Sequence, residues 1–355
     1  RCHPLQPFSA ENYNGTTLPA SFNQFWMPAS SQGSSPLFLD GPLPLPPKPE
    51  TQVELEALLR FWHNPARYFL RQHLGMGLRE GETLVEEAEP FSLDGLARYG
   101  LRQDIIRRRL TGQEEGRISA VLDGQGRLPQ GNFAELALAG PMNEALALAA
   151  ALQPYVLHPI PPLEVQAAFE NALLCGWLDK LYQSGRIAWA AGGARANLLL
   201  ESWLCHLVLA AVTPDDRQDL SCTSHIFSWN AKAQSVQHCT FKEMDVDLAR
   251  QHLSPYVEGF LQGQEGQTMP FFPNSALAWA ERISKGGDME KACNAARTVW
   301  QGGFNTRGER EDPAFLQLFP LEDPIDEQFL HLAGLFLPLL AARKEVVVEV
   351  DDAAA

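Results

Sequence analysis

One carboxylate in a strand-like segment raises the question of metal-dependent phosphodiester chemistry. Asp179 lies in "LLCGWLDKLYQSGRIAWAAGG", residues 173–193, which predicts two short strands around a tight turn with Asp179 inside the first. A Mg²⁺ site of this kind needs an acid there and an acid-x-lysine pair on the second strand, because alternate residues share a face. The matching positions are Ala188 and Ala190, which flank Trp189. Neither alanine binds a metal or transfers a proton, so we expect this sheet not to cut DNA.

Other motifs that mark catalytic or cofactor sites are missing from the sequence. The nine histidines show no H-x-x-x-H or H-E-x-x-H spacing, and there is no G-x-S-x-G, phosphate-binding loop or G-x-G-x-x-G. The six cysteines form no C-x-x-C pair, which argues against zinc, an iron–sulfur cluster and a disulfide framework. We expect His206 to be a core or edge residue. Gly192 and Gly193 could leave amides open to an anion, although a helix-start turn explains them equally.

Two features are candidates for contact with nucleic acid. One predicted helix is basic, and its residues Arg102 and Arg109 lie two turns apart, so that the row could follow a phosphate backbone. The members of the row are Arg98, Arg102, Arg107, Arg108 and Arg109. A solvated helix face, or salt bridges to the nearby acidic segments "EEAE" and "QEEG", explains the same residues. Trp189 could stack on a base, although a place in the core is the simpler expectation.

Composition limits the kinds of protein that this chain can be. Its 355 residues are 45% hydrophobic and 20% charged, which suits one large domain or two smaller ones. The net charge of −15 argues against a free-standing DNA binder, so any nucleic-acid contact must be local or shared with partner chains. The longest apolar candidate for a membrane span, residues 329–342, is too short. The chain begins at Arg1 without a signal-peptide pattern, and we interpret it as a piece of a longer, cytoplasmic protein.

The sequence divides into two parts. Residues 1–50, with six prolines between Pro36 and Pro49, predict an extended linker, in which Phe22, Phe25 and Trp26 suggest docking on another surface. Residues 51–355 predict an α/β (α+β) domain with a small mixed sheet flanked by helices. The expected helices span 51–62 (with Thr51 and Glu54 as a capping box), 64–75 (with Asn64 as N-cap and Gly75 as stop), 92–112, 132–153, 194–212, 246–263, 274–284, 288–301 and 326–342. Strand-like runs cover 221–230 and 235–244.

Several stretches in the same order resemble the C-terminal part of the RecC family, the gamma chains of exodeoxyribonuclease V (RecBCD). They are "HPLQPFS", "RFWHNPARYFLRQHLG", "EPFSLDGLARYGLRQ", "LPQGNFAE", "GWLDKLYQSGRIAW", "WLCHLVLAA", "LSPYVEGFLQGQEGQTMPFFP" and "FLPLLAARKE". The resemblance implies a restriction-endonuclease-like PD-(D/E)XK domain that has lost its active site. Active relatives read Asp-Tyr-Lys-Thr-Gly where residues 188–192 read Ala-Trp-Ala-Ala-Gly. A glutamine–tyrosine pair expected in the next helix is replaced by Glu201 and Cys205, and Asn64 stands where a cluster-binding relative has cysteine.

The resemblance also implies a function inside a complex. The domain is expected to be no enzyme by itself, to scaffold RecB-like and RecD-like subunits, and to guide or split DNA in double-strand break repair by homologous recombination. Its DNA partners would be double-stranded ends, forks and single strands, near the bacterial nucleoid. Mg²⁺ and ATP would belong to the partner subunits. Asp179 would remain as part of a turn or as a salt-bridge partner of Lys180 or a nearby arginine.

Two alternatives remain open. The first is a working Mg²⁺-dependent DNA nuclease domain, in which Asp179 is essential. The second is a module that binds only proteins and never contacts DNA.

Overall fold

The computed structural model describes residues 52–77, 92–213, 219–303, 306–320 and 323–346, together with residues 6, 9, 12, 13, 38, 39 and 43. The chain forms two units, Arg1–Gly41 and Pro42–Ala355. Most of the predicted linker, including its three docking aromatics, lies outside the described residues. The described helices and strands lie in the second unit.

The main strands of this unit form two sheets, one of five strands and one of three, and both are mixed. In a five-stranded part, β5 and β6 run parallel while the other neighbouring pairs are antiparallel, in the order β10-β7-β6-β5-β4. A three-stranded part has the order β1-β3-β2, with β1 parallel to β3. The strands are β1 (Gln52–Glu54), β2 (Leu163–Ala168), β3 (Leu173–Leu178), β4 (Leu181–Tyr182), β5 (Gly185–Ala190), β6 (Ser224–Asn230), β7 (Ser235–Phe241) and β10 (Arg343–Val346).

The chain passes from the three-stranded sheet to the five-stranded sheet at a corner in the segment that carries Asp179. The expectation that Asp179 lies inside a strand is wrong: β3 ends at Leu178, and the chain resumes as β4 at Leu181. Between them Lys180 takes a left-handed φ of 59°, which is uncommon for a residue with a side chain. The Lys180 carbonyl still accepts a hydrogen bond from the Ile187 amide at 3.0 Å. The chain therefore pairs with β2 before this corner, as β3, and with β5 after it, as β4.

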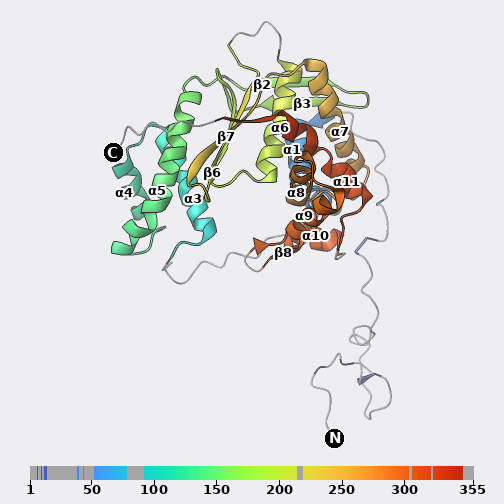
Figure 1. The fold of residues 1–355 in the computed structure, drawn as a ribbon, viewed down its shortest axis with the longest axis horizontal. Helices are drawn as coiled ribbons and strands as arrows, with labels where there is room; N and C mark the ends of the chain where they lie inside the picture. The colour runs from blue at the N-terminus through green and yellow to red at the C-terminus, as the bar shows by residue number, and fades with distance from the viewer. Residues whose placement is uncertain are drawn as a thin grey trace. The chain divides into compact units, whose positions relative to one another are not determined.

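Helices cover both faces of the five-stranded part (Figure 1). On one face lie α3 (Gly95–Leu110) and α5 (Asn132–Leu152), whose apolar side chains pack with Ile187, Ala191 and Phe227 of the sheet. On the other face lies α6 (Ala196–Val212), which connects β5 to the parallel strand β6. Helix α6 is buried at every position from Ser202 to Ala211, as expected for the central layer between the sheet and further helices.

The remaining helices pack beyond α6. They are α1 (Leu55–His63), α2 (Pro65–Leu74), α7 (Val246–Gln264), α8 (Pro273–Ser284), α9 (Met289–Gln301), α10 (Pro313–Leu318), α11 (Glu327–Ala333) and α12 (Phe336–Ala342). Shorter elements are α4 (Glu115–Gly124), η3 (Gln153–Tyr155), β8 (Gly302–Gly303), β9 (Thr306–Arg307) and η4 (Glu309–Glu311). Phe272 packs against Trp300, Phe315 and Phe329 at ring-centroid distances of 4.3, 5.0 and 5.7 Å, which joins α8 to α9, α10 and α11.

Two glycines of α7 allow α1 to approach closely. A Cβ atom at Gly259 would lie 2.7 Å from Cζ2 of Trp62, and one at Gly263 would lie 2.4 Å from Cε2 of Phe61. Both distances are far below van der Waals contact, so only glycine fits beneath these rings. The Trp62 indole also donates to the Tyr256 carbonyl at 2.9 Å.

The mixed α/β architecture predicted from the sequence is confirmed, with corrections at element ends. The capping box of Thr51 and Glu54 is wrong, because residues 52–54 pair with β3 and α1 begins only at Leu55, with no side-chain cap bond from Glu54. The start of α2 is confirmed, since the Asn64 side chain accepts a hydrogen bond from the Arg67 amide. The helix expected over 326–342 is divided into α11 and α12. Within the described ranges no helix is both long and apolar enough to span a membrane.

Candidate functional site

The positions that would hold the second acid and the lysine lie on the α6 side of β5. Ile187 and Ala191 pack into the core with α3 and α5, and Trp189 packs partly against the same core. Because side chains alternate along a strand, Ala188 and Ala190 face the opposite way, toward α6. Ala188 is only 5% exposed. Two methyl groups therefore stand where metal-binding and proton-transferring groups would be required.

The carboxylate of Glu201 on α6 is paired with two cations. Arg186, only 1% exposed, places Nη2 at 3.4 Å from Oε1 of Glu201, and Lys180 places Nζ at 3.6 Å from the same oxygen. Lys180 thus pairs with Glu201, while Asp179 is exposed in the corner after β3. Burial raises the pKa of the neighbouring Cys205 thiol. Both cations offset the charge of Glu201, which makes this carboxylate a weaker ligand for a divalent cation.

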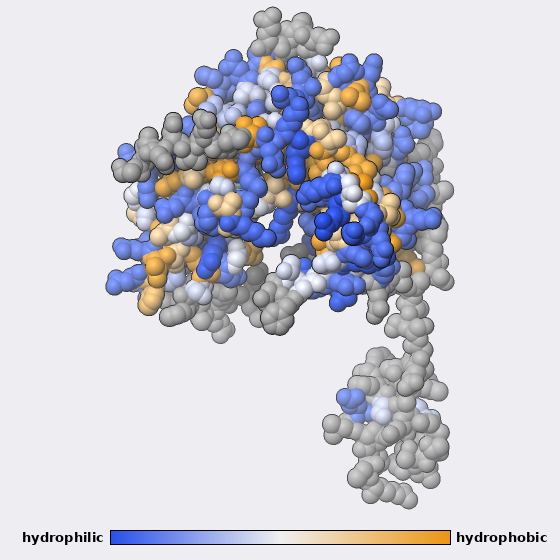
Figure 2. Space-filling view, viewed as in Figure 1, coloured by the Kyte–Doolittle hydropathy of each residue, from blue (hydrophilic) through white to orange (hydrophobic). Residues whose placement is uncertain are grey.

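A groove opens beside these residues at the carboxyl ends of β5 and β6. Its volume is about 800 Å³, and we call it the β5 groove. Its lining comes from the ends of α1 and β6, the start of α3, the end of β5 and the start of α6. The lining residues are His63, Gly95, Leu96, Tyr99, Arg102, Trp189, Ala190, Gly192, Gly193, Arg195, Leu198, Glu201, Trp229 and Ala231. The carboxyl ends of parallel strands are where open α/β sheets usually bind ligands. A hollow between the α3–α5 helices and the C-terminal helices is visible on the molecular surface (Figure 2).

Aromatic and cationic side chains dominate the chemistry of the β5 groove. Trp189 and Tyr99 are half-buried, and Trp229 is 6% exposed with an indole N–H that has no acceptor among the described residues. Arg102 forms an ion pair with Glu144 of α5. The guanidinium of Arg195 is exposed and has no ion pair or hydrogen bond within the described part of the chain. Desolvation lowers the pKa of His63.

The structure separates the predicted arginine row. Only Arg102 lines the β5 groove. Arg108 donates to Asp104 at 3.1 Å, and Arg109 donates to the Gln113 carbonyl at 3.3 Å. Arg98 and Arg107 are exposed outside the groove. The row does not share one face, because α3 buries Leu101, Ile105 and Ile106 against its neighbours and distributes the arginines around the remaining surface.

Several lining residues were not among the sequence-based candidates. Arg195 lies two residues after Gly193, and the glycine pair lines the same groove. Trp229 ends a predicted strand, and only the pairing of β6 with β5 brings it near Trp189. No local signal links His63 to this region, since α1 reaches the groove through tertiary packing.

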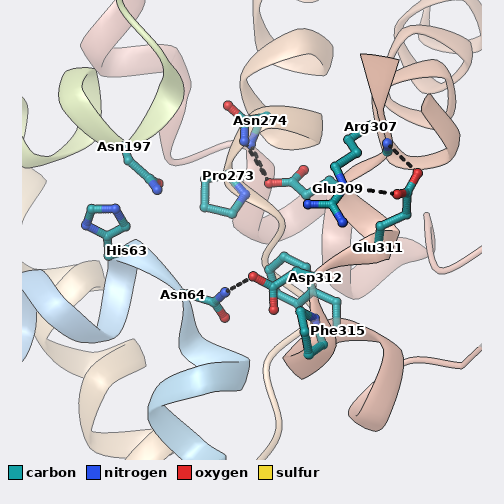
Figure 3. A pocket seen from close by; sticks show the side chains of 12 residues that line it. His63, Asn64, Asn197, Pro273, Asn274, Arg307, Glu309, Glu311, Asp312 and Phe315 are labelled. Carbon is teal, nitrogen blue, oxygen red and sulfur yellow. Dashed lines mark hydrogen bonds and ion pairs between the residues drawn. The ribbon is translucent and has the colours of Figure 1, made fainter. Parts of the chain in front are cut away.

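Two further cavities share His63 with the β5 groove. One, of about 340 Å³, follows α1 and α2 and is lined by Arg60, Arg67 and Arg71. The other, of about 500 Å³, contains three carboxylates, and Arg307 pairs with Glu311 there (Figure 3). Asp312 accepts hydrogen bonds from Asn64 at 3.2 Å and Arg67 at 2.9 Å.

Glu309 in the same cavity anchors the start of α8. Its carboxylate accepts from the backbone amide and the side chain of Asn274 (Figure 3) at 3.0 and 3.1 Å. It also accepts from the backbone amide and the hydroxyl of Ser275, both at 2.8 Å. Asp312 thus connects the start of α10 to α2, and Glu309 connects η4 to the start of α8. In the portion of the chain that the structure describes, no group of three or more His, Cys, Asp or Glu side chains could hold a metal ion.

Comparison with known proteins decides the family. The model of the RecC C-terminal domain matches residues 50–284. The chain belongs to the RecC C-terminal domain family. It is 26% identical over 327 residues to the RecBCD enzyme subunit RecC of Escherichia coli (strain K12), which covers 89% of this chain and 28% of that protein.

Other RecC proteins match in the same way. The RecBCD enzyme subunit RecC of Haemophilus influenzae is 24% identical over 284 residues, or 77% of this chain and 24% of that protein. The same subunit of Mycobacterium tuberculosis (strain H37Rv) is 23% identical over 334 residues, or 91% of this chain and 29% of that protein. The chain therefore spans between a quarter and three tenths of the length of these RecC relatives.

Proposed function

We propose that this RecC C-terminal domain is a non-catalytic part of a RecC-type subunit, which scaffolds a helicase–nuclease complex and guides DNA through it. One observation carries the proposal: the groove at the ends of β5 and β6 keeps aromatic and cationic side chains, whereas Ala188 and Ala190 occupy the positions for metal and proton chemistry. The one nearby carboxylate on α6, Glu201, is paired with Lys180 and Arg186.

The order of strands supports a nuclease-like ancestry. The segment β2, β3–β4 and β5 is an antiparallel meander, and α6 then leads to β6, which is parallel to β5. This is the arrangement expected of a PD-(D/E)XK core, in which the corner at Asp179 and the end of β5 would face the same site. The inactive state follows from side chains and not from loss of the backbone frame.

The partners are proposed from the relatives, which are named as subunits of the RecBCD enzyme. RecB-like and RecD-like chains would supply ATP-driven and Mg²⁺-dependent chemistry, together with positive charge that this chain, at −15, does not have in surplus. Double-stranded ends, forks and the single strands that leave them would be the DNA forms handled during double-strand break repair by homologous recombination.

The decisive experiment is reconstitution of the full-length subunit with its RecB-like and RecD-like partners, with and without residues 51–355. Loss of assembly or of duplex unwinding on deletion is expected. Normal assembly and unwinding by the deleted complex would overturn the proposal. A separate incubation of this chain with linear DNA and Mg²⁺ addresses the alternative of an active nuclease, for which Asp179→Ala should abolish cleavage. We expect no cleavage before or after that substitution.

A module that contacts only proteins is the remaining alternative. Crosslinking of a forked duplex to the assembled complex distinguishes it from the proposed function. We expect crosslinks to residues 51–355, and their absence from this region would favour the protein-only module.

A further inference from the structure

We propose that the outer face of the three-stranded sheet, centred on Trp177, docks a basic segment of a partner protein. This inference rests on the proposed function, because the partner is a chain of the same assembly. It specifies one surface of the domain and the chemistry of the segment that covers it.

Trp177 of β3 is exposed although its side chain is large and mostly apolar. Of the seven tryptophans that the structure describes, it alone is exposed, with 65% of its surface accessible. Tryptophan is enriched among the residues that contribute most to protein–protein binding, because its ring offers a large contact area and a polar edge. Trp177 therefore has the properties of an anchor for a partner and does not serve the core of this chain.

The sheet holds Trp177 on the side away from the helices. Side chains alternate along a strand, so the buried Leu174 and Leu178 of β3 face α1 and α6, and Trp177 faces outward (Figure 1). Glu164 of β2 is directly opposite Trp177 in the antiparallel register. Glu54 of β1 is opposite Cys175, which is two residues before Trp177 on the same face. The tryptophan thus lies beside carboxylates on a three-stranded platform.

The carboxylates of this face keep their negative charge. Gln166 donates through Nε2 to Oε1 of Glu164 at 2.9 Å, and the Cys175 thiol donates to Oε1 of Glu54 at 3.4 Å. Both donors are neutral, and neither glutamate forms an ion pair within the described part of the chain. The outward positions of β1, β2 and β3 carry no lysine or arginine. The outer face is therefore acidic around an aromatic centre.

This combination fits a cationic side chain. An arginine or lysine over the face of a tryptophan is attracted by the ring quadrupole, and arginine also stacks on aromatic rings while it pairs with a carboxylate. One arginine of a partner can thus contact Trp177 and Glu164 together, because cross-strand neighbours lie about 5 Å apart. Chains that neutralise DNA phosphates carry a surplus of lysine and arginine, which this chain, at −15, does not have.

The same charges argue against nucleic acid as the occupant. A base could stack on Trp177, but its phosphates would approach Glu164 and Glu54, which have no neighbouring cation on the described outer face to offset them. Like charges brought together in this way oppose binding. The outer face is therefore assigned to a basic protein segment.

The first test is photo-crosslinking of the full-length subunit, reconstituted with its RecB-like and RecD-like partners and a forked duplex. We expect p-benzoylphenylalanine in place of Trp177 to crosslink to a partner-chain segment of net positive charge, which mass spectrometry would identify. A crosslink to DNA, to another part of the same subunit or to a segment without net positive charge would overturn the inference, as would no crosslink at all.

The second test is titration of the partner chains against variants of the subunit. Trp177→Ala and Glu164→Lys should each lower the affinity about tenfold or more, and Glu164→Gln should make it less sensitive to salt. Glu290→Lys is the matched control, because it reverses an exposed charge on α9 and should leave the affinity unchanged. Circular dichroism and thermal unfolding verify that each variant is folded.

Two results distinguish this inference from the proposed function. Unchanged affinity in Trp177→Ala and Glu164→Lys, or equal losses in Glu164→Lys and Glu290→Lys, would overturn the inference alone if deletion of residues 51–355 still prevents assembly. Normal assembly and unwinding after that deletion would instead overturn the proposed function and, with it, the need for a partner on this face.

Discussion

Nη2 of Arg186 lies 3.4 Å from Oε1 of Glu201, while Nε and Nη1 of the same buried guanidinium have no acceptor among the described residues. The charge of Arg186 is therefore balanced mainly by the carboxylate of Glu201. Lys180, which lies between β3 and β4, pairs with the same carboxylate. This relationship ties the corner after β3, the start of β5 and helix α6 to a single oxygen atom.

Glu201→Gln should consequently destabilise the fold. It removes the balancing charge of a buried guanidinium, and breaking such a pair typically costs about 3–5 kcal/mol, which we reduce to about 2 kcal/mol because Glu201 is partly exposed. Urea denaturation measures the loss. Glu56→Gln, which breaks an exposed pair with Arg60, should cost less than about 1 kcal/mol. Equal losses in the two variants would contradict the buried-charge account.

Gly263→Ala should destabilise the packing of α7 on α1. The new Cβ would lie 2.4 Å from the Phe61 ring, and overpacking of this kind costs about 1–3 kcal/mol. Adding Phe61→Leu should recover part of the loss, which a double-mutant cycle in denaturant would reveal as coupling. Gly116→Ala in α4 is the control, because nothing lies within 4 Å of its Cβ position, and it should leave stability unchanged or slightly higher.

Stability should fall in mild acid because of buried histidines. Burial lowers the pKa of His206 from 6.5 to about 4, so its neutral form is favoured in the folded protein. The unfolded chain takes up a proton as pH falls below 6.5, and stability is lost progressively between pH 6.5 and about 4. Each such histidine contributes a limiting slope of about 1.4 kcal/mol per pH unit.

Thermal unfolding between pH 4.5 and 8 measures this dependence. His206→Asn, which keeps a polar group near Ser224 without a titrating ring, should flatten the acid side of the profile. His331→Asn is a control for general histidine effects, because His331 is on the exposed side of α11. An unchanged slope in His206→Asn would exclude His206 as a source of the acid sensitivity.

Glu309→Ala should detach the start of α8. Four hydrogen bonds to one half-buried carboxylate would be lost, and the Asn274 and Ser275 amides would lose their acceptor. Hydrogen bonds to a charged group contribute about 1.5–3 kcal/mol each, although such losses do not add, so we expect about 3 kcal/mol in total. Hydrogen exchange should show faster exchange at these two amides. Glu311→Ala, which breaks a mostly exposed pair with Arg307, serves as the comparison.

Local chemistry explains which parts of the fold were predictable. The Asn64 cap, Pro65 and the Gly75 stop lie within one helix, so the sequence alone predicts α2 correctly. The three residues 52–54 have a helical pattern, yet they form β1 because β3, more than a hundred residues later, offers a strand to pair with. Asp179 was expected inside a strand because alternation does not reveal a left-handed residue such as Lys180, which ends one part of the sheet and starts the next.

In the candidate site, too, local features can be predicted from the sequence and long-range contacts cannot. The replacement of acid and lysine by Ala188 and Ala190 is visible in the sequence, because it depends only on strand period and family pattern. The β5 groove is not, since it brings together His63, Arg102, Trp189 and Trp229 from four distant segments. The neighbours of the arginines on α3 are not visible in the sequence either, because the counting of charges on a helix does not show that α5 provides Glu144 for Arg102.

The aromatic contacts of Phe272 have a consequence for how this domain is delimited. The family match ends at residue 284, but Phe272 packs against Trp300, Phe315 and Phe329, and β10 adds the edge strand next to β7. Asp312 likewise completes the hydrogen bonding of Asn64 and Arg67 from 248 and 245 residues away. The packed unit is thus longer than the part that the family model matches. A protein cut at residue 284 would lose the aromatic partners of Phe272 and expose the face of α8 that they cover.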